Sequence, residues 1–385
     1  MEKRKIYKVL LTGGPCGGKT TSINQLRQAL SEKYDVYIVP ELGEFMAKVG
    51  VTFEPLSQIT EEYKKNFWDS QMGIQMSRED NLRFFFGDNG RDVVILCDRG
   101  LWDCFAFGPD HLRRDYLTES KQSRQQLLID RYDLIVVMVS SAFGIPEIYG
   151  LDNNILRIEN LQEAIDLEKR ILDIYAGHPN MFLVDNFVKD IDIKIARICD
   201  GVNRFIDQES PLMTIRKLLI PSNETWERLL KSIPCLKKFT VSEKHNFLEP
   251  SDNNSCVKLV QRRCTDDHET TEVNWLVTKA GDSCRNKRDK ITKTQYESRM
   301  NTLLSPRHWE VDKSITVFID LRDNGVHNIW ELHHVLTKTG ETSILKVKRD
   351  FCYPAGVFPF DIDLEECQDV SDKTEFATEF LARKN

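Results

Sequence analysis

The sequence predicts an α/β domain with a parallel sheet, followed by an α+β domain whose strands are mostly antiparallel. Three observations support this fold class. A glycine-rich motif occupies residues 13–20, directly after the first apolar segment. Short apolar segments then alternate with longer mixed segments through the first half, and a period-two alternation runs through the second. We assign residues 1–208 to the first domain, 209–233 to a connector and 234–385 to the second domain.

The glycine-rich motif has the form of a phosphate-binding loop. Gly13-Gly14-Pro15-Cys16-Gly17-Gly18-Lys19-Thr20 fits G-x-x-x-x-G-K-[ST] without a mismatch, with an expected strand before it at residues 7–11 and an expected helix after it at residues 20–30. Backbone N–H groups of such a loop bind phosphate oxygens, the lysine reaches the β- and γ-phosphates, and the hydroxyl binds Mg²⁺. We therefore expect nucleotide contacts from Gly13, Gly14, Pro15, Cys16, Gly17, Gly18, Lys19, Thr20 and Thr21.

The first half holds four further apolar segments that read as buried strands, at residues 36–39, 93–97, 134–139 and 181–184. Ligands of an open parallel sheet bind where its strands end, so acidic residues at those ends are candidates for chemistry. Glu41 follows the second strand and Asp98 the third. An acidic residue after a hydrophobic strand is the Walker B pattern, and we expect Asp98 to hold Mg²⁺ together with Thr20. The alternatives are a helix cap for Asp98 and a solvated loop carboxylate for Glu41.

A segment rich in Gly, Pro and Ser follows the fourth strand, at residues 140–150. P-loop kinases place a mobile lid in this region, and Arg157 is the expected lid residue, with an exposed helix-face arginine as the alternative. Glu41, Asp98 and Arg157 are the candidates for catalytic roles. Asn186 follows the fifth strand, where such folds often hold the nucleobase. No N-K-x-D guanine motif occurs there, so these residues do not specify the base.

The second half predicts strands at residues 239–241, 257–264, 273–279, 316–322, 329–336 and 343–349, and a helix at residues 292–304. Many antiparallel strands favour a barrel or a strongly curved sheet. Period two places Lys258 and Arg262 on one face of their strand. Lys346 and Lys348 likewise share a face, and Lys279 ends another strand. These cations bind phosphates if they line a barrel interior, and are solvated if they point outward.

Charge is distributed unevenly along the chain. Residues 211–350 carry 24 Lys+Arg and 19 Asp+Glu, a net charge of +5, whereas the whole chain has −7 and its last segment, residues 351–385, has −5. A basic domain in an acidic protein favours an anionic partner. The ten cysteines form no C-x-x-C pair, which favours reduced thiols in the cytosol. Because the longest apolar runs are shorter than the ~20 residues that span a bilayer, we expect a cytoplasmic protein that attaches peripherally to membranes. No nucleic acid partner is expected.

The phosphate loop, Val39-Pro40-Glu41 and Asp98-Arg99-Gly100 together resemble the AAA-like P-loop family, which includes bacterial nicotinamide riboside kinase domains. The second half resembles the CYTH or triphosphate-tunnel family through Lys237-Lys238-Phe239-Thr240-Val241, Val260-Gln261-Arg262-Arg263 and Leu276-Val277-Thr278-Lys279. The pairing of the two domains resembles the animal family of TRPL translocation defect proteins over nearly the whole chain. That resemblance implies binding of GTP and of phosphoinositides, and a part in ion-channel trafficking. The implied lipid-headgroup residues are Lys238, Lys258, Arg262, Lys279, Lys346 and Lys348.

One departure from the CYTH pattern bears on activity. Hydrolases of that family begin with E-x-E-x-K, whose glutamates hold the catalytic metal, and the matching positions here are Pro234, Leu236 and Lys238. Without those carboxylates the domain cannot hold Mg²⁺ against a triphosphate, so its lysines would bind an anion and leave it intact. We therefore expect a GTP-binding protein with Mg²⁺ as cofactor, whose second domain binds phosphoinositide headgroups. A small-molecule kinase acting on a nucleoside or a nicotinamide riboside-like acceptor is the alternative.

Overall fold

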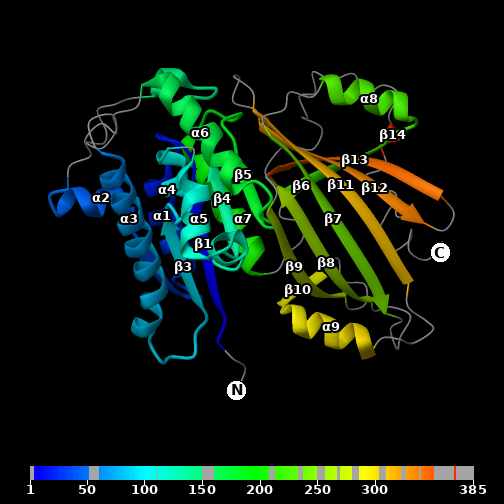
Figure 1. Ribbon diagram of the computed structural model, residues 1–385, viewed down its shortest axis with the longest axis horizontal. Helices are drawn as coiled ribbons and strands as arrows, with labels where there is room; N and C mark the ends of the chain where they lie inside the picture. The colour runs from blue at the N-terminus through cyan, green and yellow to red at the C-terminus, as the bar shows by residue number, and fades with distance from the viewer. Residues whose placement is uncertain are drawn as a thin grey trace. The chain divides into compact units, whose positions relative to one another are not determined.

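The chain forms two compact units, each with its own sheet (Figure 1). The first unit comprises Met1–Asn203 and Asp323–Val326, and the second Arg204–Arg322 and His327–Asn385. The computed structural model describes residues 4–51, 60–109, 111–149, 160–207, 213–232, 237–248, 256–266, 269–279, 286–302, 309–321, 327–337, 340–350 and 368–369.

The first unit is built on a five-stranded parallel sheet in the order β2-β3-β1-β4-β5. Its strands are β1 (Ile6–Thr12), β2 (Asp35–Val39), β3 (Val93–Asp98), β4 (Leu134–Met138) and β5 (Met181–Val184). All five predicted strands are confirmed. Every residue of β3 and β4 is buried, as expected for a parallel sheet with helices over its faces. Because β1 lies between β3 and β4, the loop that follows β1 leaves the middle of the carboxyl edge of the sheet.

Helices pack around this sheet (Figure 1). They are α1 (Lys19–Leu30), α2 (Leu42–Lys48), α3 (Glu61–Asn81), η2 (Leu82–Phe85), α4 (Asp103–Phe107), α5 (Leu112–Ser120), η3 (Gln125–Ile129), η4 (Pro146–Ile148), α6 (Leu161–Tyr175) and α7 (Ile191–Ile206). Helix α6 begins at a capping box in which Asn160 and Glu163 each accept a hydrogen bond from the other's backbone N–H. Its buried face carries Ala164, Leu167 and Ile171. The strong amphipathic pattern of α6 therefore fixes which of its residues meet the core.

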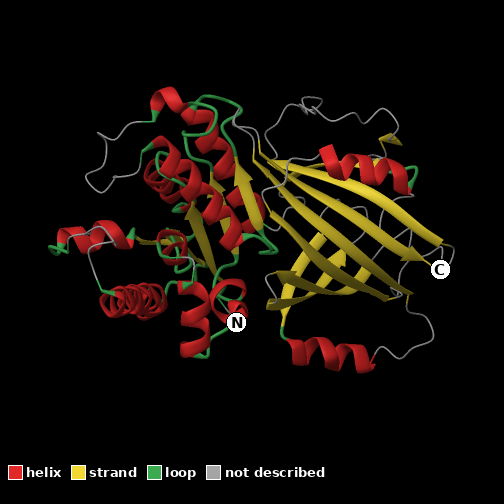
Figure 2. Cartoon of the chain, turned by 45° about the horizontal axis from the view of Figure 1, so that its top comes forward, coloured by secondary structure: helices red, strands yellow, loops and turns green. Residues whose placement is uncertain are grey.

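The second unit is built on a nine-stranded sheet in the order β10-β9-β8-β7-β11-β12-β13-β6-β14, in which the described pairs are antiparallel. Its elements are β6 (Met213–Leu219), α8 (Asn223–Ser232), β7 (Lys237–Leu248), β8 (Cys256–Asp266), β9 (Glu269–Lys279), β10 (Asn286–Ile291), α9 (Lys293–Thr302), β11 (Trp309–Leu321), β12 (His327–Thr337), β13 (Gly340–Asp350) and β14 (Gln368–Asp369). Figure 2 shows that this sheet is strongly curved. The described pairings form one open series, so closure into a CYTH-like barrel stays a prediction.

One side of this second sheet, the inner face, is buried. It carries Phe239 and Val241 of β7 and their partners Val317 and Ile315 of β11. In β7 these buried residues alternate with the exposed Lys238, Thr240 and Ser242, the period-two pattern of a half-buried antiparallel strand. The apolar core of the second unit therefore includes this face.

Two elements of the second unit differ from the sequence-based expectation. Residues 209–233 were expected to form a connector, yet they contain α8 and also β6, which pairs with β13 in the sheet. Strand β10 was not expected at all. Its sequence, Asn-Lys-Arg-Asp-Lys-Ile, lacks apolar alternation because it is the last described strand at one end of the sheet, where charged residues are common. In the part of the chain that the structure describes, no helix has both the length and the apolar composition needed to cross a bilayer.

Candidate functional site

The loop between β1 and α1 follows a path that only glycine permits at several positions. Gly13 has φ of +129° and Gly18 has φ of +88°, conformations that L side chains rarely adopt. A Cβ at Gly13 would lie 2.0 Å from the carbonyl oxygen of Met138, and one at Gly17 would lie 2.8 Å from the same atom. The loop thus packs directly against the end of β4. This close backbone approach explains the glycines of the motif.

Lys19, the first residue of α1, points back into the loop. Its Nζ donates hydrogen bonds to the carbonyl oxygens of Gly13, at 2.9 Å, and Gly14, at 2.8 Å. The side chain is buried, and burial together with the neighbouring Arg99 charge lowers the pKa of Lys19 to about 8. Thr20 and Thr21 are exposed at the start of the helix. The loop and the start of α1 therefore combine a cation, two exposed hydroxyls and a helix N-terminus, groups that suit a polyphosphate.

Asp98 ends β3 beside the phosphate loop, since β3 pairs with β1 and Asp98 is aligned with Leu11. The carboxyl group is buried, and no hydrogen-bond partner of Oδ1 is found among the described residues. Burial raises the pKa of Asp98 to about 6, although the Lys19 charge opposes this rise. A buried carboxylate oxygen without a partner is costly, and a bound cation would remove that cost. The structure thus places Asp98 close enough to Lys19 for the two charges to interact.

Arg99 connects Glu41 to the phosphate loop. Its Nε lies 2.8 Å from Glu41 Oε1, its Nη1 lies 3.3 Å from Asp103 Oδ1, and the same Nη1 donates to the carbonyl oxygen of Gly13 at 3.2 Å. Arg99 has φ of +63°, which is unusual for a residue with a side chain. Although burial opposes the charge, Glu41 and Asp103 raise the pKa of Arg99, so its guanidinium stays charged. Glu41 is therefore held at this site by an ion pair.

Asp103 is a site residue that the sequence reasoning missed. Its side chain is buried and accepts hydrogen bonds from the Thr12 hydroxyl at 2.6 Å, the Gly100 N–H at 2.8 Å and the Tyr175 hydroxyl at 2.7 Å. These contacts fix the carboxylate that Arg99 contacts. The available signal was a second carboxylate only four residues after Arg99 in the sequence.

Glu168 of α6 was also missed as a site residue. Its side chain is fully buried, and its Oε2 accepts hydrogen bonds from the N–H groups of Gly14 and Ser140. In the sequence, Glu168 interrupts the apolar face of α6 between Leu167 and Ile171. A charged residue at a core position of an amphipathic helix was the signal that could have found it.

Asn186 and Arg157 are the remaining predicted site residues of the first unit. Asn186 is buried, and its Nδ2 donates to the carbonyl oxygens of Ser140, at 2.6 Å, and Phe143, at 2.8 Å, while its Oδ1 accepts from Lys194 Nζ at 2.7 Å. Its amide thus organises the segment after β4. Arg157 lies outside the described residues.

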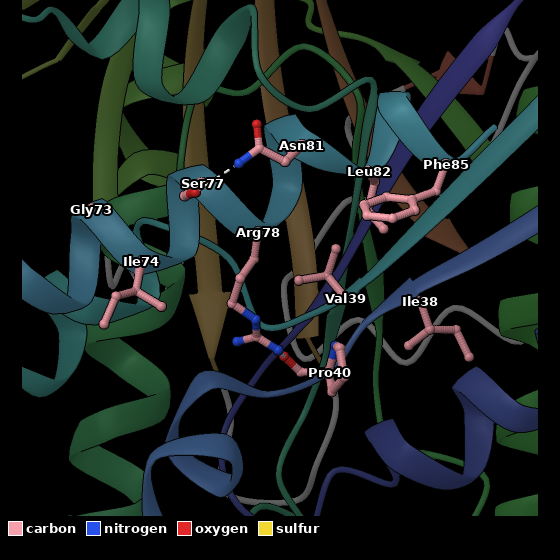
Figure 3. Close-up of a pocket in the computed structure, with 10 residues that line it drawn as sticks. All are labelled: Ile38, Val39, Pro40, Gly73, Ile74, Ser77, Arg78, Asn81, Leu82 and Phe85. Atoms are coloured by element: carbon pink, nitrogen blue, oxygen red, sulfur yellow. Dashed lines mark hydrogen bonds between the residues drawn. The ribbon is translucent and has the colours of Figure 1, made fainter. Parts of the chain in front are cut away.

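A cavity of about 500 Å³ lies between β2 and α3 (Figure 3). Its lining is mostly apolar and includes Ile38, Ile74 and Phe85. Arg78 Nη2 donates to the carbonyl oxygen of Pro40 at 2.7 Å, at one end of the cavity. No phosphate-loop residue lines it, and its apolar walls do not suit a phosphate.

In the second unit, Lys258 and Arg262 lie on the inner face, because they pair with Phe247 and Glu243 of β7. Lys258 is buried, with its ammonium 5.3 Å from the Phe247 ring centroid, and Arg262 Nε lies 3.8 Å from Glu243 Oε1. These two cations therefore do not have the solvated positions that the sequence kept as an alternative.

Two further lysines accompany them on this face. Lys313 pairs with Glu243 in the strand register and is buried, and Lys237 forms a 2.9 Å ion pair with the buried Asp266. Neither was in the predicted set.

Lys238 differs from the rest of the predicted set. It is exposed on the opposite side of the sheet from Lys258, near Phe318, so it cannot belong to one site with the inner-face cations. The register aligns Lys346 with Glu331 of β12, which in turn is aligned with the inner-face residue Val317 of β11. Positions 346 and 348 therefore belong to the inner face. Lys279 is aligned with Cys256.

Comparison with known proteins supports the assignment of the first unit. Residues 8–190 match a family described as AAA domain. This match covers most of β1, the phosphate loop and all four other strands of the first sheet. Residues 8–190 are thus similar to an AAA domain, and the first unit has the parallel sheet and phosphate loop of a P-loop domain. A search of curated proteins gives no match to the chain.

Solved structures with some similarity include the hypothetical protein NE1496, at 15% identity over 44% of this chain and 97% of that chain, with a TM-score of 0.29. Another is thymidylate kinase from Ehrlichia chaffeensis, at 13% identity over 51% of this chain and 99% of that chain, with a TM-score of 0.35. Similarity at this level carries no statement about activity.

Proposed function

We propose that the chain is a GTP-binding protein whose second unit binds phosphoinositide headgroups and which acts in membrane trafficking of ion channels. The observation that carries the first part is the phosphate loop, with Lys19 hydrogen-bonded to the carbonyl groups of Gly13 and Gly14. A loop of this composition between a buried strand and a helix N-terminus binds nucleotide phosphates.

Mg²⁺ fits the same site. The Oδ1 atom of Asp98, buried and without a hydrogen-bond partner in the described structure, and the exposed Thr20 are the residues that would hold it. When bound with a nucleotide, the ion neutralises charge on the β- and γ-phosphates. Lys19 and the loop N–H groups orient the phosphates, and Arg99 holds Glu41 at the edge of the site.

The preference for GTP rests on the resemblance to the TRPL translocation defect family, since the residues after β5 carry no guanine motif. Calorimetry of the full chain with Mg²⁺-GTP, Mg²⁺-ATP and Mg²⁺-CTP tests it. We expect GTP to bind at least tenfold more tightly than the others. Equal affinities would contradict the proposed preference for GTP but not nucleotide binding itself. No binding of any of the three nucleotides would contradict the proposed function.

The headgroup proposal is supported by the cations of the inner face. Lys258 and Lys313 are buried there, and burial of an ammonium is costly unless an anion is near. Glu243 and Asp266 offset part of this charge. Phosphate groups of a headgroup bound beside the inner face would add further hydrogen-bond acceptors for these cations. Attachment to the membrane would then be peripheral, through headgroups.

A kinase acting on a small-molecule acceptor is the second candidate, favoured by the Arg99–Glu41 ion pair beside the loop. There Glu41 or Asp98 would orient the acceptor hydroxyl. Incubation with labelled GTP or ATP, with and without nucleosides or nicotinamide riboside, separates the two. A phosphorylated acceptor supports the kinase, whereas retained or slowly hydrolysed GTP supports the proposed function.

A further inference from the structure

Glu168 is a buried carboxylate whose contacts the proposed function does not use. It lies on α6, far in sequence from the phosphate loop, and has no exposed surface. Its Oε2 accepts one hydrogen bond from the Gly14 N–H at 2.7 Å and another from the Ser140 N–H at 2.9 Å. One oxygen atom therefore joins the phosphate loop, the segment after β4, and α6.

We propose that Glu168 is a positioning residue that fixes the shape of the phosphate loop, and so the affinity for nucleotide, by joining Gly14 and Ser140 to α6. The proposal rests on the nucleotide binding proposed above.

Further contacts support this role. The Ser140 hydroxyl donates to the carbonyl oxygen of Pro15 at 2.5 Å, so two successive loop residues are bonded to the same cluster. The Lys19 ammonium bonds the carbonyl of Gly14, whose N–H bonds Glu168. Gly14 is thus held from both sides of its backbone.

The packing at Gly14 also supports a positioning role for Glu168. A Cβ there would lie 2.5 Å from Glu168 Oε2 and 2.9 Å from Ser140 Cβ. Glu168 therefore approaches the loop so closely that a side chain at position 14 would displace it, although the motif itself does not require a glycine there.

The charge of Glu168 is not what the loop requires. A negative charge beside a phosphate site repels the ligand. Burial raises the pKa of Glu168, although the hydrogen bonds from the Ser140 and Gly14 N–H groups oppose this rise. No hydrogen-bond partner of Oε1 is found in the described structure. A neutral amide oxygen can still accept both N–H groups, although each bond is weaker than one to a carboxylate. The Glu168→Gln variant therefore separates geometry from charge.

The test compares Glu168→Gln and Glu168→Ala in the full chain, with Glu163→Ala as the matched control. Glu163 lies on the same helix and also accepts a backbone N–H, from Asn160, but it is exposed and belongs to the capping box of α6. Affinities for Mg²⁺-GTP and Mg²⁺-ATP are measured by calorimetry. Thermal unfolding shows that each variant is folded at the assay temperature.

We expect Glu168→Gln to bind nucleotide within threefold of the wild type and Glu168→Ala to lose at least tenfold, because the N–H groups of Gly14 and Ser140 then lose their acceptor. Glu163→Ala should bind as the wild type does. Unchanged affinity in Glu168→Ala, or equal losses in the Gln and Ala variants, would overturn the proposal.

Hydrogen–deuterium exchange supplies a readout that does not need nucleotide. Amides in the peptides covering Gly14 and Ser140 should exchange faster in Glu168→Ala than in the wild type, and at the wild-type rate in Glu168→Gln and Glu163→Ala. If the wild type binds no nucleotide, the proposed function fails while this exchange pattern still tests the role of Glu168. Unaltered exchange in Glu168→Ala would refute that role.

Discussion

Lys19 is a buried side chain that contacts the phosphate loop and not the apolar core. Its ammonium is buried against two loop carbonyls, and burial lowers its pKa to about 8, so the folded state gains little from its charge. We predict that Lys19→Ala weakens Mg²⁺-GTP binding by roughly 10- to 100-fold, the worth of a charged hydrogen bond of about 1.5–3 kcal/mol. The thermal midpoint should stay within a few degrees. Lys33→Ala, on the surface, is the control. Undiminished affinity would exclude this loop as the phosphate site.

Asp98 gives the site a pH dependence. Its pKa of about 6 in the folded protein exceeds its ordinary value, so the carboxyl is ionised only above that pH. We predict that the gain in GTP affinity on adding Mg²⁺ disappears as the pH falls from 7 to 5, since a protonated carboxyl does not bind the metal. Titrations with Mg²⁺ and with EDTA measure this gain.

The Asp98→Asn variant is the comparison for that titration, because the γ-phosphate also takes up protons near this pH. The variant should lack most of the Mg²⁺-dependent gain at pH 7 and show a flatter pH profile, while binding in EDTA stays near that of the wild type. Equal losses with and without metal would remove Asp98 from the magnesium site.

Sequence reasoning predicted site residues only where a motif named them. Lys19 and Asp98 follow from their spacing and from the strands before them. Asp103 and Glu168 could not be assigned in this way, because they bond residues distant in sequence. Asp103 accepts hydrogen bonds from the hydroxyls of Thr12 and Tyr175. Glu168 accepts them from the N–H groups of Gly14 and Ser140. Tertiary packing of α6 decides that contact, and local patterns do not contain it.

Among the secondary-structure elements, the segment after β4 depends on Asn186 and on α7. Lys194 of α7 donates to Asn186 Oδ1 and to the Val139 carbonyl, and burial lowers the pKa of Lys194 to about 7. We predict that Asn186→Ala lowers the free energy of unfolding by about 2–4 kcal/mol, because buried carbonyls and an ammonium lose partners. Urea unfolding measures it. A loss of GTP affinity without a loss of stability would instead support the base-contact role predicted from the sequence.

Strands with a clear apolar pattern were predicted from the sequence, whereas strands without one were missed. The five strands of the first sheet have largely apolar sequences, so their positions follow from composition. Strand β6 lies between Pro211 and Pro221 and was therefore read as a connector. Its pairing with β13, more than a hundred residues later, is what makes it a strand.

At the scale of the whole molecule, the inner face of the second sheet predicts salt-sensitive membrane binding. We predict that the full chain binds vesicles containing phosphoinositides and that rising salt weakens binding, since the Debye length is ~10 Å at 0.1 M. Lys346→Glu with Lys348→Glu should reduce affinity by roughly 1 kcal/mol per charge removed, and more for reversal. The chain should release no phosphate from inorganic triphosphate with Mg²⁺. Vesicle co-sedimentation and a phosphate-release assay measure these outcomes.

The opposite side of that sheet provides the control. Lys238→Glu with Arg263→Glu makes the same change in charge at two exposed residues there, and should leave vesicle binding nearly unchanged. Equal effects of both double variants would mean that total charge, and not the inner face, governs attachment. Efficient triphosphate hydrolysis would contradict the proposed inactive phosphate site.

The pairing of β6 with β13 sets an order for biosynthesis. During translation β6 emerges first among the strands of the second sheet, but its partner appears only when residues 340–350 have left the ribosome. Until then neither edge of β6 has its partner, because β14 follows β13 in the sequence, and unpaired edges favour association between chains. The first unit has no such delay, because its five strands lie within residues 6–184. A nascent chain stalled before residue 340 should therefore carry a folded first unit and depend on chaperones for the second.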